Sequence, residues 1–213
     1  MDARTFGLGD RLIGEFDKAI KVLGAPSRAA RPLPGAGGGE LVLEKAEAQE
    51  SARLMRVNHA GEVAAQALYQ GQALTARDQT VTAAMQQAAA EETDHLAWCE
   101  RRLEELGGRT SLLNPLWYAG SFAIGALAGA FGDRASLGFI TETEKQVESH
   151  LSDHLSRLPA ADARSRSILE QMKQDEIAHG AKAQSLGGLA LPLPLRLLMR
   201  ATSRIMTRTS YWI

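Results

Sequence analysis

The chain has 213 residues, a formal net charge of −1 and a single cysteine, Cys99. This length suffices for one domain with a sizeable core, and the near-zero charge gives no indication of a nucleic-acid partner. One cysteine excludes an internal disulfide and a thiolate metal cage, and it fits a reducing compartment. Aromatic residues make up only 5% of the sequence, whereas alanine, leucine and glutamate are abundant, which favours helices over sheets.

Residues 1–43 are expected to hold one amphipathic helix and a linker. Apolar residues recur every three or four positions over 8–23, and residues 25–39 are rich in proline and glycine without an apolar period. The first residues lack the basic and apolar regions of a secretory signal. No run reaches the roughly 20 apolar residues that a transmembrane helix needs.

Residues 44–186 are expected to form four long amphipathic helices. Their predicted ranges are 44–76, 78–106, 133–158 and 162–186. Asp78 suits the N-cap of the second helix, Gly107 suits the residue that follows its C-terminus, and Pro159 stops the third.

Two further segments differ from these helices in their charge. Residues 115–131 carry no charge and, at about 1.5 Å per residue, span near 25 Å, which is short of a bilayer's hydrocarbon core. We interpret them as a hydrophobic crossover helix that is either buried or dips into one leaflet. Residues 187–213 form a basic amphipathic tail with an arginine at every fourth position from Arg196 to Arg208. This pattern suits a membrane interface, although the same strip would also suit a subunit contact.

Two Glu-x-x-His motifs stand in the second and fourth helices of the expected bundle. They are Glu92 with His95 and Glu176 with His179. Residues three apart share one face of an α-helix, so both side chains of each motif can reach the same point. A carboxylate and an imidazole are metal ligands.

A preceding glutamate accompanies each motif. Glu62 lies 30 residues before Glu92, and Glu144 lies 32 residues before Glu176. This is the ligand set of di-iron and di-manganese four-helix bundles. The alternative, that each acid flanks the core and meets solvent or arginine, is common for one glutamate but disfavoured for six residues in register. The candidate metal-binding and catalytic residues are therefore Glu62, Glu92, His95, Glu144, Glu176 and His179.

The types of these ligands indicate which metal they would bind. Four carboxylates and two imidazoles without thiolate favour iron or manganese over structural zinc. Each histidine also follows an acid by one helical turn, because Glu91 precedes His95 and Asp175 precedes His179. Each acid is expected to accept the outer ring N–H of its own histidine, the alternative being a solvated charge.

Three nearby residues are open to two interpretations. His59, one turn before Glu62, either supports the site or is a partly exposed histidine, and the second is simpler. Tyr69 lies two turns beyond Glu62 and fits either a phenol near the site or packing. Cys99 lies one turn beyond His95 and fits a small core residue.

Four stretches between about residue 50 and residue 185 carry a family resemblance. They are LMRVNHAGEVAAQALYQGQ (54–72), EETDHLAWCERRLEELGGR (91–109), LGFITETEKQVESHL (137–151) and ILEQMKQDEIAHGAKA (168–183). With the His-Ala-Gly-Glu that ends at Glu62 and the paired Glu-x-x-His motifs, they resemble the bacterial form of the demethoxyubiquinone hydroxylase family of ubiquinone biosynthesis. One departure is Leu151, where animal relatives carry an aromatic residue, so the resemblance supports no electron-relay role there.

The resemblance implies an all-α, ferritin-like four-helix bundle that binds two iron ions per chain. The family's iron ligands fall on the six candidate residues. In related di-iron bundles the glutamate of each Glu-x-x-His bridges the metals, which implies that Glu92 and Glu176 bridge while Glu62 and Glu144 are terminal. The extra crossover helix and the C-terminal amphipathic segment complete the expected fold.

The resemblance also implies a monooxygenase that hydroxylates the ring of a 3-methyl-6-methoxy polyprenyl benzoquinol with O₂ and two electrons. It would be peripheral on the cytoplasmic face of the bacterial cell membrane, with residues 115–131 and the basic tail as a docking surface. The sequence has no dinucleotide fingerprint, so the electrons would come from an external donor or directly from a reduced nicotinamide. Whether the protein forms a homo-oligomer or joins a ubiquinone-biosynthesis complex stays open.

Three rival functions are weaker. An iron-storage bundle needs a soluble, cage-forming exterior, which the uncharged helix and basic tail disfavour. A rubrerythrin-like peroxidase needs a four-cysteine iron site, which one cysteine excludes. A membrane-associated interaction protein without enzymatic activity would bind no stoichiometric metal.

Overall fold

The structure is a computed structural model, and it describes residues 8–37 and 42–213. Residues 1–7 and the end of the predicted linker, 38–41, lie outside the described residues. The elements are α1 (Leu8–Gly24), α2 (Lys45–Thr75), α3 (Gln79–Glu105), α4 (Asn114–Ala130), α5 (Asp133–Arg157), α6 (Ala163–Ser185) and α7 (Leu193–Trp212). Within the described ranges every element is a helix, which confirms the all-α prediction.

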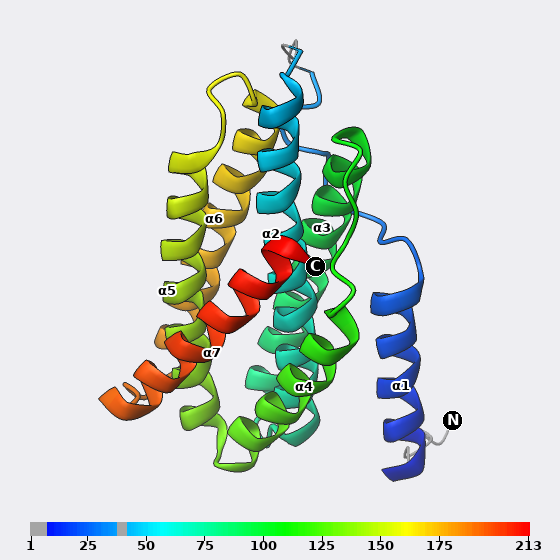
Figure 1. Cartoon of the computed structure of the whole chain (residues 1–213). Coiled ribbons are helices and arrows are strands. Elements are labelled where there is room, and N and C mark those ends of the chain that lie inside the picture. Colours follow the sequence, from blue (N-terminus) through cyan, green and yellow to red (C-terminus); the bar gives the residue numbers. More distant parts are fainter. Residues whose placement is uncertain (1–7, 38–41) are drawn as a thin grey trace.

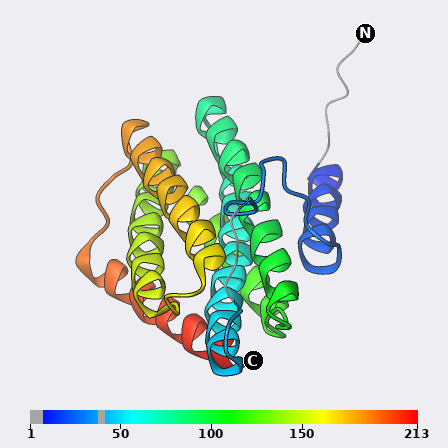
Figure 2. The same ribbon diagram turned by 90° about the horizontal axis from the view of Figure 1, so that it is seen from above.

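Four of these helices form the bundle. In Figure 1, α2 and α6 run downward while α3 and α5 run upward, and Figure 2 shows the four packed around a common interior. The chain therefore makes two antiparallel hairpins, α2–α3 and α5–α6, with α4 between them in sequence. This is the arrangement that the repeated Glu then Glu-x-x-His unit predicts.

Local capping explains where the bundle helices begin and end. The Asp78 carboxylate accepts a hydrogen bond from the backbone N–H of Thr80 at 2.7 Å and so caps α3. The backbone after α3 turns at Gly107, where φ is +63°, a left-handed conformation that glycine adopts readily. The N-cap predicted at Asp78 and the stop predicted at Gly107 are therefore confirmed.

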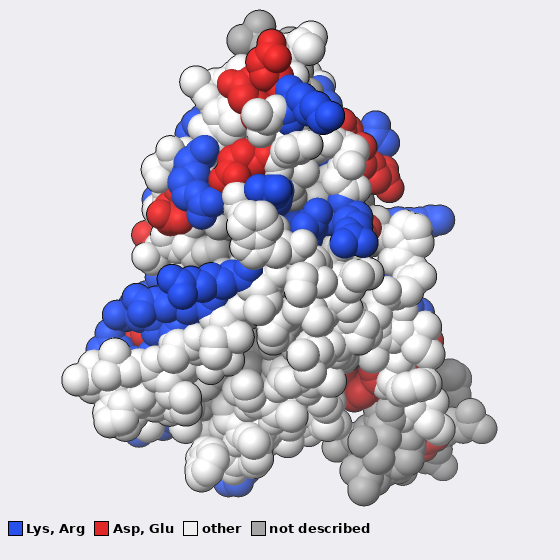
Figure 3. Space-filling model, in the orientation of Figure 1, with Lys and Arg blue, Asp and Glu red and all other residues white. Residues whose placement is uncertain are grey.

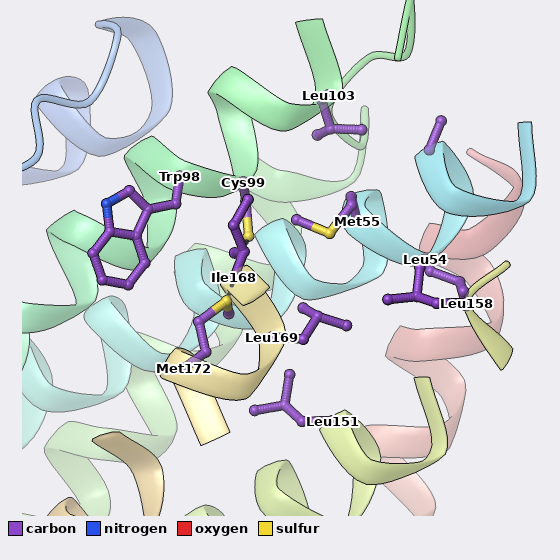
Figure 4. Packing of buried hydrophobic residues seen from close by; sticks show 11 residues of the cluster. Leu54, Met55, Trp98, Cys99, Leu103, Leu151, Leu158, Ile168, Leu169 and Met172 are labelled. Atoms are coloured by element: carbon purple, nitrogen blue, oxygen red, sulfur yellow. Dashed lines mark hydrogen bonds between the residues drawn. The ribbon is translucent and has the colours of Figure 1, made fainter. Parts of the chain in front are cut away.

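Two apolar clusters form layers along the bundle, and a third, smaller cluster of Val63, Ala67, Leu96 and Tyr118 joins α2 and α3 to α4. The upper layer holds Leu54, Met55, Trp98, Cys99, Leu103, Leu151, Leu158, Ile168, Leu169 and Met172, which Figure 4 shows pointing inward from the bundle helices. A second layer contains Tyr69, Val81, Met85, Leu137, Ile140 and Ala183. Cys99 is a buried core residue, as predicted. Along each bundle helix, the candidate ligands lie between the residues that contribute to one layer and those that contribute to the other.

The uncharged helix α4 lies along α2 outside the bundle and is only partly covered. Glycines allow the two backbones to approach closely, because a Cβ added to Gly125 would lie 2.2 Å from the Leu68 carbonyl oxygen. The outer face stays open, with 60% of Leu116, 62% of Leu127 and 84% of Phe131 exposed. Of the two alternatives for this crossover helix, the buried one is therefore wrong. Among the described residues, no helix has both the length and the apolar character needed to cross a bilayer.

The remaining segments cover the sides of the bundle. Helix α7 crosses α2 and α5 on the face that Figure 1 presents. Its Ser210 is buried and accepts a hydrogen bond from the Trp117 indole at 3.0 Å. The linker after α1 passes over α3, where the Ser27 N–H donates to Glu100 at 2.8 Å.

Candidate metal centre

The six candidate ligands meet in one buried cluster. The cluster consists of two groups that share Glu176. Within each group the potential ligand atoms lie within 4.8 Å of one another. The first group is Glu62, Glu92, His95 and Glu176, and the second is Glu144, Glu176 and His179. His179 is the most exposed of the six at 8%. Four helices thus deliver these side chains to one point between the apolar layers.

Two of the glutamates lie between the two histidines. Nδ1 of His95 is 3.2 Å from Glu92 Oε2 and 3.3 Å from Glu176 Oε1. Nδ1 of His179 is 3.5 Å from Glu92 Oε1 and 3.4 Å from Glu176 Oε2. Glu62 lies near only one histidine, 3.6 Å from His95 Nδ1. The cluster therefore has two halves, a His95 half and a His179 half, joined by two central carboxylates.

Burial and mutual repulsion decide the charges in this cluster. Burial, with the nearby charge of Glu92, raises the pKa of Glu62 well above its usual value, and burial with the charge of Glu176 does the same for Glu144. Burial also opposes ionisation of Glu92, but hydrogen bonding from Glu62 and the charge of His95 outweigh it and lower its pKa. Without a cation, these shifts favour the neutral forms of Glu62 and Glu144, because adjacent carboxylates repel one another.

The histidines complete this balance. Burial lowers the pKa of both rings, but the surrounding carboxylates outweigh it, so the pKa of His95 is raised and that of His179 is raised to about 12. The protonated, cationic form of both rings is therefore favoured beside the Glu92 carboxylate. Three buried polar atoms still have no hydrogen-bond partner: Glu92 Oε1, Glu176 Oε2 and His179 Nδ1. Unpartnered buried oxygens and a ring nitrogen around one point are what metal ions would satisfy.

The outer nitrogens of the two histidines contact acids of the opposite helix. His95 Nε2 lies 2.9 Å from Asp175 Oδ2 on α6, and His179 Nε2 lies 2.7 Å from Glu91 Oε2 on α3. Glu91 and Asp175 are thus the predicted acids, but the predicted pairing within each helix is wrong. Because Nδ1 of each ring faces the cluster, Nε2 points away from it toward the neighbouring helix.

Comparison with known proteins agrees with this geometry. A sequence profile described as ubiquinone biosynthesis protein COQ7 matches residues 49–210. The chain is similar to proteins named 3-demethoxyubiquinol 3-hydroxylase. The one from Nitrosomonas eutropha is 59% identical over 96% of this chain and 98% of its own length. The one from Cupriavidus necator is 58% identical over 96% of this chain and 100% of its own.

The chain belongs to the COQ7 family. The resemblance inferred from the motifs is therefore confirmed, and so is the helical bundle that goes with it. The match spans the four bundle helices together with α4 and nearly all of α7. The N-terminal helix and linker precede it.

The sequence of this COQ7-family chain left two interpretations of Tyr69 open, a phenol near the site and a packing residue. Its buried hydroxyl donates a hydrogen bond to Glu144 Oε1. Its ring meets the His179 ring edge-on, with centroids 6.3 Å apart. Burial and the charge of Glu144 raise the pKa of Tyr69 well above 10, so the phenol stays protonated. Tyr69 therefore belongs to the His179 half of the cluster as well as to the apolar layer.

His59 differs from its simpler sequence interpretation. It is 3% exposed, lies 3.4 Å from Glu100 and contacts the Asn114 amide at 3.3 Å. The expectation of partial exposure is wrong because α4 and the linker side of α3 cover this part of α2. His59 contacts no candidate ligand among its recorded partners.

Arg31 is a neighbour of the cluster that the sequence patterns missed. Its Nη1 donates to Asp175 Oδ2 at 2.8 Å, and its Nε donates to Asp94 Oδ2 at 2.5 Å. An arginine in a proline-rich linker, 63 residues before Asp94, carries no local signal for such a contact. Only the path of the linker over α3 brings it there.

Proposed function

We propose that this chain is a di-iron monooxygenase of ubiquinone biosynthesis that hydroxylates the ring of a 3-methyl-6-methoxy polyprenyl benzoquinol, demethoxyubiquinol. The observation that carries the proposal is the convergence of two Glu-x-x-His motifs and two further glutamates in one buried cluster. The names of the relatives agree with this activity. The electrons would come from an external donor.

The arrangement of the carboxylates supports a two-metal centre. Glu92 and Glu176 each approach both histidines, as bridging ligands would. Glu62 belongs only to the group of His95, and Glu144 only to that of His179, as terminal ligands would. Carboxylate and imidazole donors without thiolate suit iron or manganese. Two bound irons would supply the reductive activation of O₂.

The protein's own residues position and shield this chemistry. The outer acids Asp175 and Glu91 hold the ring nitrogens His95 Nε2 and His179 Nε2, which leaves each Nδ1 free to bind metal. The apolar layers above and below exclude water, which protects reactive species from side reactions. A narrow cavity of about 40 Å³ under α7 borders Glu62, Glu144 and Glu176. The cluster therefore comes close to the side of the bundle that α7 covers.

Metal content and quinol hydroxylation test the proposal together. Iron and manganese per chain are measured on freshly purified protein by elemental analysis, and the quinol product by mass spectrometry. We expect about two irons per chain and loss of hydroxylation in Glu92→Ala. Glu104→Ala is the matched control, because Glu104 lies exposed on the same helix. No metal after anaerobic Fe²⁺ reconstitution, or full activity in Glu92→Ala, would overturn the proposal.

We propose further that the chain docks peripherally on the cytoplasmic face of the membrane through α4 and α7. Figure 3 shows an uncharged face over these helices, bordered by a row of basic side chains along α7. Leu127 of α4 and Leu198 of α7 are both 62% exposed. Arg200 and Arg204 line the groove between α7 and α5. Apolar side chains beside a basic border suit the interface of an anionic bilayer.

Vesicle binding tests this docking face. Leu127→Glu combined with Leu198→Glu should weaken sedimentation with anionic vesicles by more than about tenfold, because each leucine loses about 1.5–3 kcal/mol of burial. Arg200→Gln combined with Arg204→Gln should cost roughly 30-fold, at about 1 kcal/mol per arginine. Ile177→Glu, at a 48% exposed position on α6, is the control. Equal binding by all variants would reject this face.

A further inference from the structure

The linker residue Arg31 joins the two helices that carry the Glu-x-x-His motifs. Its guanidinium contacts Asp94 of α3 at 2.5 Å and Asp175 of α6 at 2.8 Å. Asp94 immediately precedes His95, and Asp175 immediately precedes Glu176. The backbone N–H of Ala30 also donates to Asp94 Oδ1 at 2.6 Å. One side chain from outside the bundle thus fixes α3 and α6 to each other at the level of the cluster.

Arg31 also contacts the two groups that hold the outer side of His95. Asp175 Oδ2 receives both Arg31 Nη1 and His95 Nε2. The guanidinium carbon lies 4.7 Å from the centroid of the Trp98 ring, and that ring lies 5.5 Å from the His95 ring. The planar fork of arginine can make both carboxylate contacts and stack on an indole at once, which a lysine cannot do. His95 is therefore confined by two neighbours that share one anchor.

The His179 side has no equivalent anchor among the contacts described. Glu91 accepts from Gln87 at 3.0 Å and contacts His179, and 34% of its side chain is exposed. The Asp175 side chain is 15% exposed and that of Asp94 is 6% exposed. The difference between the two halves is thus a guanidinium bridge on one side only, made by an arginine whose own side chain is 35% exposed.

We propose that Arg31 is a positioning residue that sets the metal affinity of the His95 half of the cluster. It holds the Asp175 carboxylate where that group orients the His95 ring, so that Nδ1 stays directed at Glu92, Glu62 and Glu176. The inference rests on the proposed metal centre. Outer-shell partners of metal-binding histidines typically change metal affinity by about 10–100-fold when they are removed. The effect should fall on one metal ion of the two.

The test is a Co²⁺ titration of metal-free full-length protein against a competing chelator, followed by the visible d–d absorption of bound Co²⁺. Wild type should bind about two ions per chain. Arg31→Gln should keep one ion at wild-type affinity and bind the other about 10–100-fold more weakly. Arg31→Lys keeps the positive charge but not the planar guanidinium. Its affinity for the weakened ion should lie between those of wild type and Arg31→Gln. Arg28→Gln, at an exposed position on the same linker, should match wild type.

The outcomes separate positioning from mere structural support. Equal affinity for both ions in Arg31→Gln and wild type overturns the inference. Equal weakening of both ions, together with a lower melting temperature of the metal-free protein, also overturns it, because it indicates loss of the fold. If Arg31→Gln does not fold, Arg31→Lys decides, and wild-type affinities in that variant reject the role. Absence of Co²⁺ binding by wild type would instead contradict the proposed metal centre.

Discussion

The two Glu-x-x-His motifs are alike in sequence, but their histidines lie in unlike surroundings. His95 is fully buried, and its partner Asp175 is held by Arg31 and by Gln171, whose amide donates at 3.0 Å. His179 is 8% exposed, and the side chain of its partner Glu91 is 34% exposed, against 15% for Asp175. Burial raises the pKa of Asp175, but the hydrogen bonds from His95 and Arg31 outweigh it and lower the pKa to about 2.

This difference shows how a repeated motif becomes an asymmetric site. The candidate ligands come from the repeat, whereas the residues that support them differ between its two copies. The His95 half takes Arg31 from the linker. The His179 half takes Tyr69 from α2, which binds Glu144. We therefore expect two metal positions with similar ligands and different affinities.

The largest effect should come from a glutamate that both halves share. Glu176→Ala removes a carboxylate that lies near both histidines, so both ions and all hydroxylation should be lost. Glu62→Ala removes a carboxylate near His95 alone, so about one ion should remain. Elemental analysis of both variants beside Glu170→Ala, an exposed position on α6, measures this. Equal metal loss in both would break the division into halves.

Metal affinity should depend steeply on pH. The pKa values of Glu62, Glu144, His95 and His179 are raised in the metal-free protein, which favours the protonated form of each side chain. Because metal ligands must be deprotonated, binding of two Mn²⁺ ions should release protons, and metal affinity should rise with pH. A weakly buffered titration with a pH electrode measures this release. Metal binding without proton release would contradict these pKa shifts.

The same pKa shifts determine whether the free energy of unfolding of the metal-free protein rises or falls with pH. Above the ordinary histidine pKa of 6.5 the folded cluster holds more protons than the unfolded chain, because the pKa values of His95 and His179 are raised. The buried His150 and His154, whose pKa values are lowered, are neutral in both states there. Stability should therefore fall as pH rises above 6.5. Urea unfolding of the metal-free protein across neutral pH measures this slope, and a rising stability would contradict the raised pKa values of the two histidines.

The outer acids test the asymmetry directly. Asp175→Asn should weaken one ion by about 10–100-fold, because it breaks the contacts to both His95 and Arg31. Glu91→Gln should have a smaller effect on the other ion, since water can reach this partly exposed partner of His179 and replace its hydrogen bond. Chelator competition gives both affinities. A larger loss in Glu91→Gln would reverse the ranking of the halves.

The smallest effect should come from Tyr69. Tyr69→Phe removes the hydrogen bond to Glu144, which should lower the free energy of unfolding of the metal-free protein by about 1–3 kcal/mol. Metal stoichiometry should not change, because no ligand is lost. Urea unfolding beside Tyr211→Phe, outside the cluster, checks this. Loss of the second ion would make Tyr69 part of the metal binding itself.

Periodic features of the sequence were sufficient to predict the helices. Apolar spacing together with the caps at Asp78 and Gly107 gave the bundle helices to within a residue or two, because these signals act over one or two turns. The face that each ligand occupies followed in the same way. The exposure of α4 did not, since an uncharged helix fits a core and a membrane surface equally well until its neighbours are known.

What the sequence by itself determined is the set of candidate ligands and its repetition on four helices, because residue type and helical phase fix which side chains share a face. Only the tertiary structure decided which acid supports which histidine, and that Arg31 reaches Asp94 and Asp175. Contacts between helices depend on where each ring points and on the path of a linker, and neither leaves a period in the sequence. The physical reason is range: capping and amphipathicity are local, whereas these hydrogen bonds join residues from 63 to 144 positions apart.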